Sequence, residues 1–145
     1  GATLATENVF ERFASSEASH TFFHGHSYTA NPLACVAALA SIALLDDACA
    51  ARREAIARAH RAAAARFRTH PGLSGVRTLG TMFAFDLNGA HDYMNSVGAS
   101  LRRFALERGV LLRPLGNTVY VLPPYCTTDA DLAGAYAVVN EFLNQ

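Results

Sequence analysis

The first candidate for a functional site in this chain is the run 24–31, which reads His-Gly-His-Ser-Tyr-Thr-Ala-Asn. It offers flexible backbone amides at Gly25 and His26, followed by three successive hydroxyl side chains at 27–29. Such a cluster of donors suits a phosphate group, although Pro32 removes one of the amides that a helix N-terminus would add. The alternative is an ordinary turn whose hydroxyl groups hydrogen bond to nearby backbone, which is common before helices. The residues alone indicate either a phosphate-binding loop or a structural turn.

Arg113 is the second candidate. It is the only charged residue between Gly109 and Thr128, in a stretch made mostly of valine, leucine, proline and tyrosine. A guanidinium in such surroundings must reach solvent, pair with a carboxylate of its own protein, or bind an anionic ligand. Composition favours the first two possibilities. The third gains support from Pro114, because a strand end fixed by proline is a rigid place from which to hold a carboxylate.

Two other kinds of site can be drawn from the same region, and we expect neither. His20, His24 and His26 with Cys35 could be arranged around zinc, but their spacing fits no closed structural set. Cys35 is expected a full turn inside a buried helix, where a thiol is usually inert. We therefore predict no metal ion and no cysteine nucleophile.

The composition limits the possible functions. The chain has 145 residues, 51% of them hydrophobic and 17% charged, which is typical of a folded protein. Its twelve basic residues are all arginine and balance twelve acids, so lysine is absent. The arginines between 52 and 68 are spaced by alanines along an expected helix. We interpret them as a solvated helix face and expect no nucleic-acid partner.

The three cysteines, Cys35, Cys49 and Cys126, are odd in number and lie far apart among apolar residues. This favours reduced, buried thiols and a cytoplasmic location. The longest apolar stretch, 32–45, is too short to span a bilayer and no signal peptide precedes it, so we expect no membrane partner. The chain starts with glycine rather than methionine, and we expect it to be a piece of a longer protein.

Helix and strand signals predict the elements that would position these residues. Residues 2–5 suit a short strand and 6–13 a brief helix. Asn31 is a good N-cap for a helix over 32–45, whose small and apolar residues on nearly every side predict burial on most of them. After a break at 46–47, a helix rich in alanine and arginine runs to about 68.

The remaining residues predict an α+β unit of about a hundred residues. Residues 76–87 read as a strand with Phe83, Phe85 and Leu87 on one face. A helix over about 92–108 follows, with an apolar side made by Met94, Val97, Leu101, Phe104 and Ala105. Residues 110–113 and 118–122 predict a hairpin, and a closing helix capped by Thr128 or Asp129 runs to about 144. The predicted order is helix, strand, helix, strand, strand, helix.

Together the two candidate segments resemble the class III pyridoxal-phosphate aminotransferases. The family pattern is His-Gly-x-[Ser/Thr]-[Phe/Tyr] running into Asn-Pro-Leu-Ala-Cys, and this chain has it at 24–28 and 31–35. A second match consists of Gly109-Val110, Arg113-Pro114, Tyr120 and Pro123-Pro124-Tyr125, and it is similar to the substrate-binding segment of the branch that acts in biotin synthesis. Val76-Arg77, Gly80 and residues 82–87 also fit the first strand of the family's C-terminal domain. The resemblance covers essentially the whole chain.

The resemblance implies a larger α/β enzyme of fold type I. Residues 1–46 would be the last strand and helix of its large cofactor-binding domain, and residues 47–145 its small C-terminal α+β domain. The lysine that holds the cofactor as a Schiff base, and the aspartate that pairs with the pyridine nitrogen, would precede residue 1. No catalytic residue is therefore expected on this chain, which alone should be inactive.

The resemblance also implies roles for four residues. Ser27, with the backbone of His26, would bind the phosphate of pyridoxal phosphate in the partner subunit's active site, because these homodimers share their sites. Gly25 would line the substrate pocket, and Arg113 would bind the carboxylate of the keto acid 8-amino-7-oxononanoate, which accepts an amino group from a second substrate. The alternatives are another class III ω-amino acid aminotransferase and a non-catalytic dimerisation or binding module.

Overall fold

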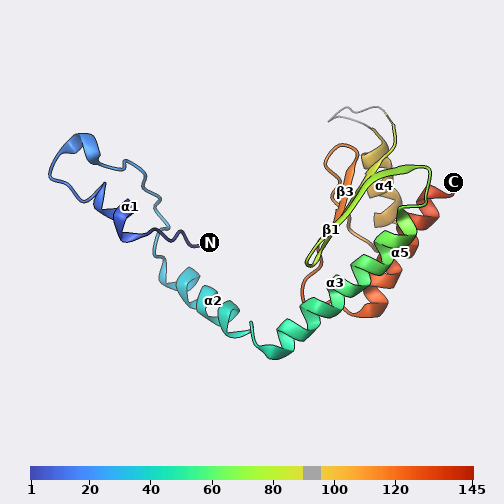
Figure 1. Cartoon of the computed structure of the whole chain (residues 1–145), viewed down its shortest axis with the longest axis horizontal. Helices are drawn as coiled ribbons and strands as arrows, with labels where there is room; N and C mark the ends of the chain where they lie inside the picture. Colours follow the sequence, from blue (N-terminus) through green and yellow to red (C-terminus); the bar gives the residue numbers. More distant parts are fainter. Residues whose placement is uncertain (90–95) are drawn as a thin grey trace. The chain divides into compact units, whose positions relative to one another are not determined.

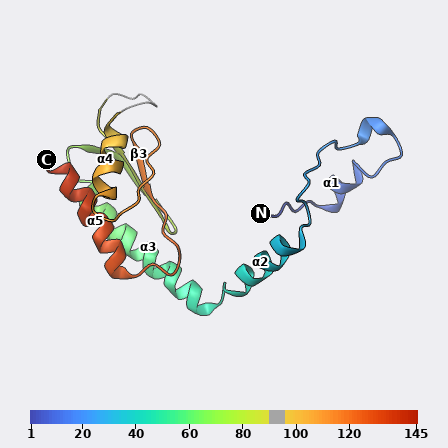
Figure 2. The ribbon, with the colours of Figure 1, turned by 180° about the vertical axis from the view of Figure 1, so that it is seen from behind.

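The computed structural model of the chain describes residues 1–89 and 96–145, which form two compact units, Gly1–Leu45 and Asp46–Gln145 (Figures 1 and 2). The assignment of these units to two domains of a longer enzyme stays a prediction.

The first unit contains helix α1 (Glu7–Glu11), a 3-10 turn η1 (Ala18–His20) and helix α2 (Pro32–Ala43). The brief helix predicted over 6–13 is present as α1. The strand expected at 2–5 is absent from this fully described unit. A strand needs a neighbour with which to exchange hydrogen bonds, and residues 1–45 supply none.

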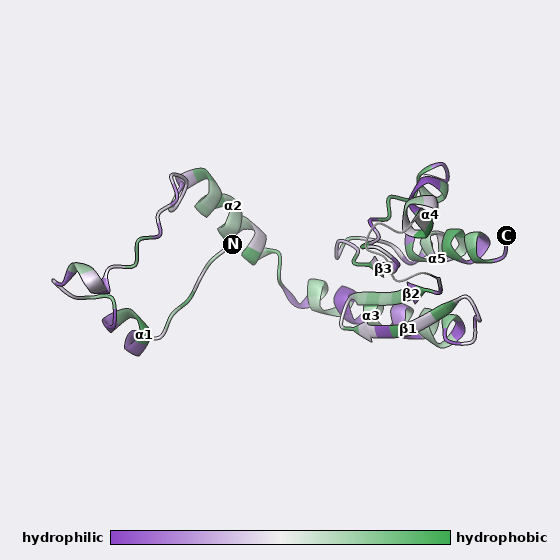
Figure 3. Cartoon of the chain, turned by 90° about the horizontal axis from the view of Figure 1, so that it is seen from above, coloured by the Kyte–Doolittle hydropathy of each residue, from purple (hydrophilic) through white to green (hydrophobic). Residues whose placement is uncertain are grey.

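Helix α2 begins where the sequence predicts. Asn31 Oδ1 accepts hydrogen bonds from the amides of Leu33 (3.0 Å) and Ala34 (3.2 Å), and Pro32 occupies the first helical position. The predicted burial is wrong for this chain: no residue of α2 is buried, and Leu33 is 82% exposed. Figure 3 shows α2 apolar along most of its length. Its own unit has no sheet or second long helix against which these side chains could pack.

The cysteines are free thiols, as predicted, but the prediction that they are buried is also wrong. Cys35 and Cys126 are exposed and Cys49 is half-buried. Cys35 shares the exposure of α2, Cys126 lies in the turn before the last helix, and Cys49 lies in the first turn of the helix that opens the second unit.

The second unit contains three helices and a three-stranded antiparallel sheet in the order β1-β2-β3. Its elements are α3 (Asp47–Phe67), β1 (Leu73–Leu79), β2 (Met82–Leu87), α4 (Ser96–Leu106), β3 (Thr118–Val121) and α5 (Asp129–Leu143). The predicted α+β class is confirmed for this unit. The order of elements differs, because the strand pairing departs from the prediction at two places.

The segment predicted as one strand is a hairpin. Gly80 has a φ of +54° and, with Thr81, turns the chain so that Leu79 pairs with Met82. The alternation of apolar residues continues through this turn, so the pattern alone does not reveal it. The predicted helix over 92–108 is present as α4, and the part of it that includes Met94 lies outside the described residues.

The predicted second hairpin is wrong. Residues 110–113 are not a strand, and β3 pairs with β2, where Phe85 lies opposite Val119 and Phe83 opposite Val121. A single bridge between Leu115 and Thr118 remains at the expected turn. The apolar run 110–113 serves the core instead through Leu112, which is 5% exposed.

The core lies between the sheet and the three helices. Phe83, Phe85 and Leu87 face it from β2, as predicted from their alternation. The helices contribute side chains that are at most 2% exposed, namely Ile56, Ala63, Ala64, Leu101, Ala105, Leu132 and Val139. Full burial of a large apolar side chain contributes about 1.5–3 kcal/mol. This core holds the sheet and helices together, and Arg113 is attached to it through the buried Leu112.

Polar contacts fasten the first helix of this unit to the last. The Arg52 guanidinium donates to the carbonyl of Thr127 and, over 2.8 Å, to the carboxylate of Asp129. Asp131 and Thr128 form a capping box at the start of α5, and the Thr128 hydroxyl holds the pKa of the Asp131 carboxyl below its ordinary value.

A buried histidine joins the same two helices. His60 is 0% exposed; its Nε2 lies 3.0 Å from the carbonyl of Thr81, which can only accept, so Nε2 carries the proton. Its Nδ1 therefore accepts from the Tyr136 hydroxyl at 2.6 Å. Burial lowers the pKa of His60 and raises the pKa of Tyr136 to about 12.

Candidate functional site

The run 24–31 folds into an exposed turn of the first unit. The amide of Thr29 donates to the carbonyl of His26 at 3.0 Å, and the amide of Asn31 donates to the carbonyl of Tyr28 at 3.1 Å. The Nδ1 atom of His26 accepts from the amide of Tyr28 at 3.1 Å. Backbone atoms and the His26 ring therefore hold the turn together.

The hydroxyl groups of this turn are not used to build it. Among the described residues, the hydroxyls of Ser27, Tyr28 and Thr29 form no hydrogen bond to another protein atom. This observation weighs against the structural-turn interpretation, in which those hydroxyls satisfy the local backbone. It leaves the Ser27 hydroxyl, beside the amides of His26 and Ser27, accessible to an anionic ligand.

The N-terminus of α2 adds no donors to this cluster. Asn31 Oδ1 accepts from Leu33 and Ala34, Asn31 O accepts from Cys35, and Pro32 has no amide hydrogen. A phosphate at this turn would therefore depend on the Ser27 region rather than on the helix terminus.

The described residues give no steric reason for glycine at position 25. A methyl group added there would meet none of their atoms within 4 Å. A role in lining a substrate pocket would therefore depend on groups from outside its own unit.

Arg113 lies in the second unit, on a segment without regular secondary structure, and is preceded by the buried Leu112 and followed by Pro114. It is exposed, and it borders a cleft of about 450 Å³. The cleft is lined by residues 110–113, residues 120–124 and the first part of α5. Most of these side chains are apolar, so the guanidinium stands at the edge of an apolar cleft.

The carboxylate that lines this cleft is already engaged. Asp131 accepts from both the amide (2.9 Å) and the hydroxyl (2.6 Å) of Thr128. Within residues 1–89 and 96–145, Arg113 forms no ion pair or hydrogen bond. Of the three possibilities raised by the sequence, pairing with a carboxylate is therefore not realised among the residues that the structure describes.

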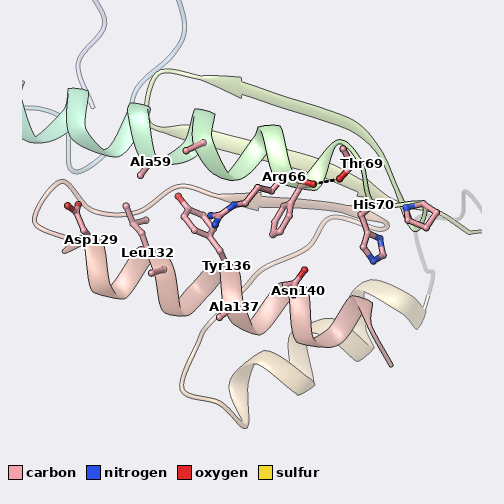
Figure 4. Close-up of a pocket in the computed structure, with 13 residues that line it drawn as sticks. Ala59, Arg66, Thr69, His70, Asp129, Leu132, Tyr136, Ala137 and Asn140 are labelled. Atoms are coloured by element: carbon pink, nitrogen blue, oxygen red, sulfur yellow. Dashed lines mark hydrogen bonds between the residues drawn. The ribbon is translucent and has the colours of Figure 1, made fainter.

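A second cavity of about 610 Å³ lies between α3 and α5. Figure 4 shows Arg66 extending from α3 toward Tyr136 of α5. Other polar groups at its edge serve the fold: the Tyr136 hydroxyl donates to His60, and the amide of Gly72 donates to His70 Nδ1 at 3.1 Å. None of the residues implicated by sequence lines this cavity.

The described part of the chain contains no group of three or more histidine, cysteine or acidic side chains placed to hold a metal ion. It also contains no single helix long and apolar enough to cross a membrane, although α2 and α3 taken together would reach the necessary length and composition as a broken span.

The site residues predicted from the sequence thus fall into two groups. Gly25, His26 and Ser27 share one turn of the first unit, and Arg113 belongs to a cleft of the second. Sequence reasoning missed Gly98, which lies in α4 against the loop that follows Arg113. An isolated glycine inside a helical pattern was the available signal.

Comparisons with known proteins agree with the class of the resemblance. Residues 1–143 match the model of the family described as aminotransferase class-III. The chain is 42% identical over 144 residues to the adenosylmethionine-8-amino-7-oxononanoate aminotransferase of Synechococcus elongatus, a match that covers 99% of this chain and 34% of that protein. It is 32% identical over 154 residues to the bifunctional dethiobiotin synthetase/7,8-diamino-pelargonic acid aminotransferase, mitochondrial, of Oryza sativa subsp. japonica, covering 99% of this chain and 19% of that one.

A solved structure shows the same fold. The adenosylmethionine-8-amino-7-oxononanoate aminotransferase from Methanocaldococcus jannaschii matches with a TM-score of 0.78 and 23% identity, over 94% of this chain and 34% of that one. The predicted fold class, a part of an α/β fold-type I transferase, is confirmed. The chain spans about a third of the length of the Synechococcus relative. Since one family model accounts for nearly every residue, the chain belongs to the class III aminotransferases, which depend on pyridoxal phosphate.

Proposed function

We propose that this chain is part of an aminotransferase of biotin synthesis that transfers an amino group to 8-amino-7-oxononanoate, giving 7,8-diaminononanoate. The observation that carries the proposal is Arg113, a guanidinium without a carboxylate partner among the described residues, at the edge of a largely apolar cleft. The proposed substrate has a carboxylate at one end of a long aliphatic chain. A guanidinium suits the carboxylate, and apolar walls suit the methylene groups.

The names of the relatives support this choice of substrate. The relatives from Synechococcus elongatus and Oryza sativa carry the aminotransferase activity in their names, and each matches 99% of this chain. Both include the region in which Arg113 lies, so the cleft is part of the matched segment.

The proposed cofactor is pyridoxal phosphate, which when bound supplies the aldehyde that accepts and releases an amino group. The residues present fit its phosphate end, because the Ser27 hydroxyl and the neighbouring amides face no competing acceptor among the described residues. They do not supply its aldehyde end, because the sequence has no lysine. The amine that holds the aldehyde and moves the proton must therefore come from outside these 145 residues.

We further propose that the enzyme is a cytoplasmic homodimer in which Ser27 and His26 reach the cofactor of the partner subunit. The turn that carries them is exposed, and the long apolar helix that follows it is uncovered within its own unit. A surface of this kind is expected where another part of the assembly packs. Exposed free thiols at Cys35 and Cys126 favour a reducing compartment.

One experiment separates this function from its alternatives. The full-length enzyme that contains this chain is loaded with pyridoxal phosphate, converted to its amine form, and mixed in a stopped-flow instrument with 8-amino-7-oxononanoate, 2-oxoglutarate or succinic semialdehyde. Return of the aldehyde absorbance is expected to be fast with the first compound and slow with the others.

The other outcomes identify the rival functions. Fast return only with one of the shorter oxo acids would indicate a different ω-amino acid aminotransferase, with another acid at Arg113. Failure to form the amine form with any donor, and no return with any keto compound, together with intact cofactor binding, would point to a non-catalytic module.

A further inference from the structure

Gly98 is buried in the first turn of α4, beside residues 114–117, which form the loop that follows Arg113. A methyl group at this position would overlap the carbonyl oxygen of Gly116 and would lie 3.1 Å from Pro114 Cβ. Glycine is unfavourable inside a helix because it costs conformational entropy. The close approach of this loop to α4 is a physical reason for glycine here.

The loop is held on its other side by β2. The amide of Leu87 donates to the carbonyl of Asn117 at 2.9 Å, and the side-chain amide of Asn117 donates back to Leu87 O at 3.2 Å. Within the loop, Leu115 and Thr118 exchange backbone hydrogen bonds of 2.9 and 3.0 Å. The loop is therefore confined between the end of β2 and the start of α4.

Helix α4 is confined as well. Its side chains Leu101 and Ala105 are 0% exposed in the core. A methyl group at position 98 would thus have to be accommodated mainly by the loop, because packed cores resist displacement.

Arg113 is joined to this loop by a rigid link. Pro114, which follows it directly, has a fixed φ and contacts the site of Gly98, while Leu112 on its other side is anchored in the core at 5% exposure. The backbone of Arg113 is set by these two neighbours.

We propose that Gly98 is a positioning residue for Arg113: the absence of a side chain at 98 lets the loop sit against α4 and so sets the place of the guanidinium. The inference rests on the proposed function, in which Arg113 binds the carboxylate of the keto substrate. Gly98 itself touches neither substrate nor cofactor and acts through Pro114.

The test compares two glycine-to-alanine variants of the full-length enzyme. Gly98→Ala adds a methyl group against the loop, whereas Gly134→Ala adds one inside α5, where it would meet no atom of the described residues within 4 Å. Gly98→Ala is expected to raise the KM for 8-amino-7-oxononanoate and lower kcat/KM by about tenfold, with the donor half-reaction unchanged. Gly134→Ala should leave both half-reactions unchanged.

A double variant tests whether Gly98 acts through Arg113. Adding Gly98→Ala to Arg113→Ala should cause no further loss of kcat/KM for the keto acid. A further, additive loss would overturn the inference, as would an equal loss in both half-reactions or an unchanged kcat/KM in the single variant. If Arg113→Ala alone leaves the keto-acid half-reaction intact, the proposed role of Arg113 fails, and this inference with it.

Pro114→Gly supplies a second route should Gly98→Ala not fold. It removes the ring carbons of proline and adds only an amide hydrogen, and it loosens the same link between Arg113 and α4. The same rise in KM with an unchanged donor half-reaction is expected. An unaltered KM would overturn the inference.

Discussion

His60 Nδ1 and the hydroxyl of Tyr136 lie 2.6 Å apart in the core of the second unit, where they join α3 to α5. The hydroxyl is the donor, because the other ring nitrogen of His60 donates to the carbonyl of Thr81. His60 is 0% exposed, so its Nδ1 atom has no bulk water to replace the hydroxyl of Tyr136 as a donor.

Tyr136→Phe is therefore expected to destabilise the protein. It leaves His60 Nδ1 buried without a donor, which costs about 1–3 kcal/mol. The midpoint of urea unfolding measures the loss. Tyr125→Phe is the matched control, since Tyr125 is 41% exposed and its ring stays available to the Arg53 guanidinium, 5.8 Å from the ring centre. Equal stability of the two variants would contradict the assigned hydrogen bond.

Stability should fall on acidification through the titration of His60. Burial holds the pKa of His60 below its ordinary value of 6.5, so at mildly acidic pH the unfolded chain binds a proton that the folded chain does not. The contribution of neutral, buried His60 to the free energy of unfolding is therefore fully present above pH 6.5. It declines as the pH falls toward the lowered pKa. The carboxyls of Glu54 and Asp131, whose pKa values lie below 4.5 and 3.8, titrate in a separate, lower range.

Urea unfolding followed between about pH 7.5 and 5 measures this slope, which one histidine limits to about one proton. His60→Gln should lose that part of the slope, whatever its effect on absolute stability. An undiminished slope in His60→Gln would assign the acid sensitivity to other groups.

Ser27→Ala is expected to weaken retention of pyridoxal phosphate in the full-length enzyme without lowering its apo-protein stability. A hydrogen bond to a charged group contributes about 1.5–3 kcal/mol, or roughly ten- to a hundredfold in affinity. Stability should be unaffected, because the turn is held by His26 and backbone atoms rather than by the Ser27 hydroxyl. Dialysis followed by cofactor titration gives the affinity.

Ser16→Ala, at another exposed serine of the first unit, is the control for this measurement. Loss of thermal stability with unchanged cofactor affinity in Ser27→Ala would return Ser27 to the role of a turn former. Mixed dimers that pair Ser27→Ala with a subunit lacking the cofactor-binding lysine show whether the contact crosses between subunits.

Arg113→Ala should slow the keto-acid half-reaction selectively. Removing one partner of a desolvated charge pair costs about 2–5 kcal/mol, so kcat/KM for 8-amino-7-oxononanoate should fall by at least about an order of magnitude. Arg113→Lys should restore little, because an ammonium cannot form the planar two-pronged contact. Arg68→Ala, at another exposed arginine of the second unit, is the control.

Stopped-flow measurement of the two half-reactions distinguishes the possible roles of Arg113. Equal loss in both would mean that Arg113 supports the site as a whole. Loss in neither would make it a solvated surface arginine.

Local signals predicted the helices well and the strands less well. Asn31 before Pro32, and Thr128 three residues before Asp131, mark helix starts through side chains that act on their own backbone. Strand partners, by contrast, depend on residues far away in the sequence. Residues 110–113 have the apolar character of a strand, yet Val119 and Val121 of β3 pair with β2.

Burial was the property least accessible from sequence. The sequence shows that α2 is apolar, but whether its side chains and Cys35 are covered depends on surfaces that the first unit does not contain. The site shows the same division. The turn at Ser27 and the isolated Arg113 could be found from residue types, while the contact of Gly98 with the Arg113 loop required the packed structure.

The polar side-chain contacts between α3 and α5 also constrain how the second unit can form during synthesis. Arg52 binds Asp129 and His60 binds Tyr136, pairs separated by 77 and 76 residues. Contacts between such distant positions close late, because a long loop must first be ordered. A ribosome must therefore release almost the whole unit before α3 reaches α5, and until then α3 and the β1–β2 hairpin can pack only on each other, with the side chains that contact α5, such as Phe83, uncovered. Nascent chains shortened before α5 should consequently be targets for chaperones and proteases.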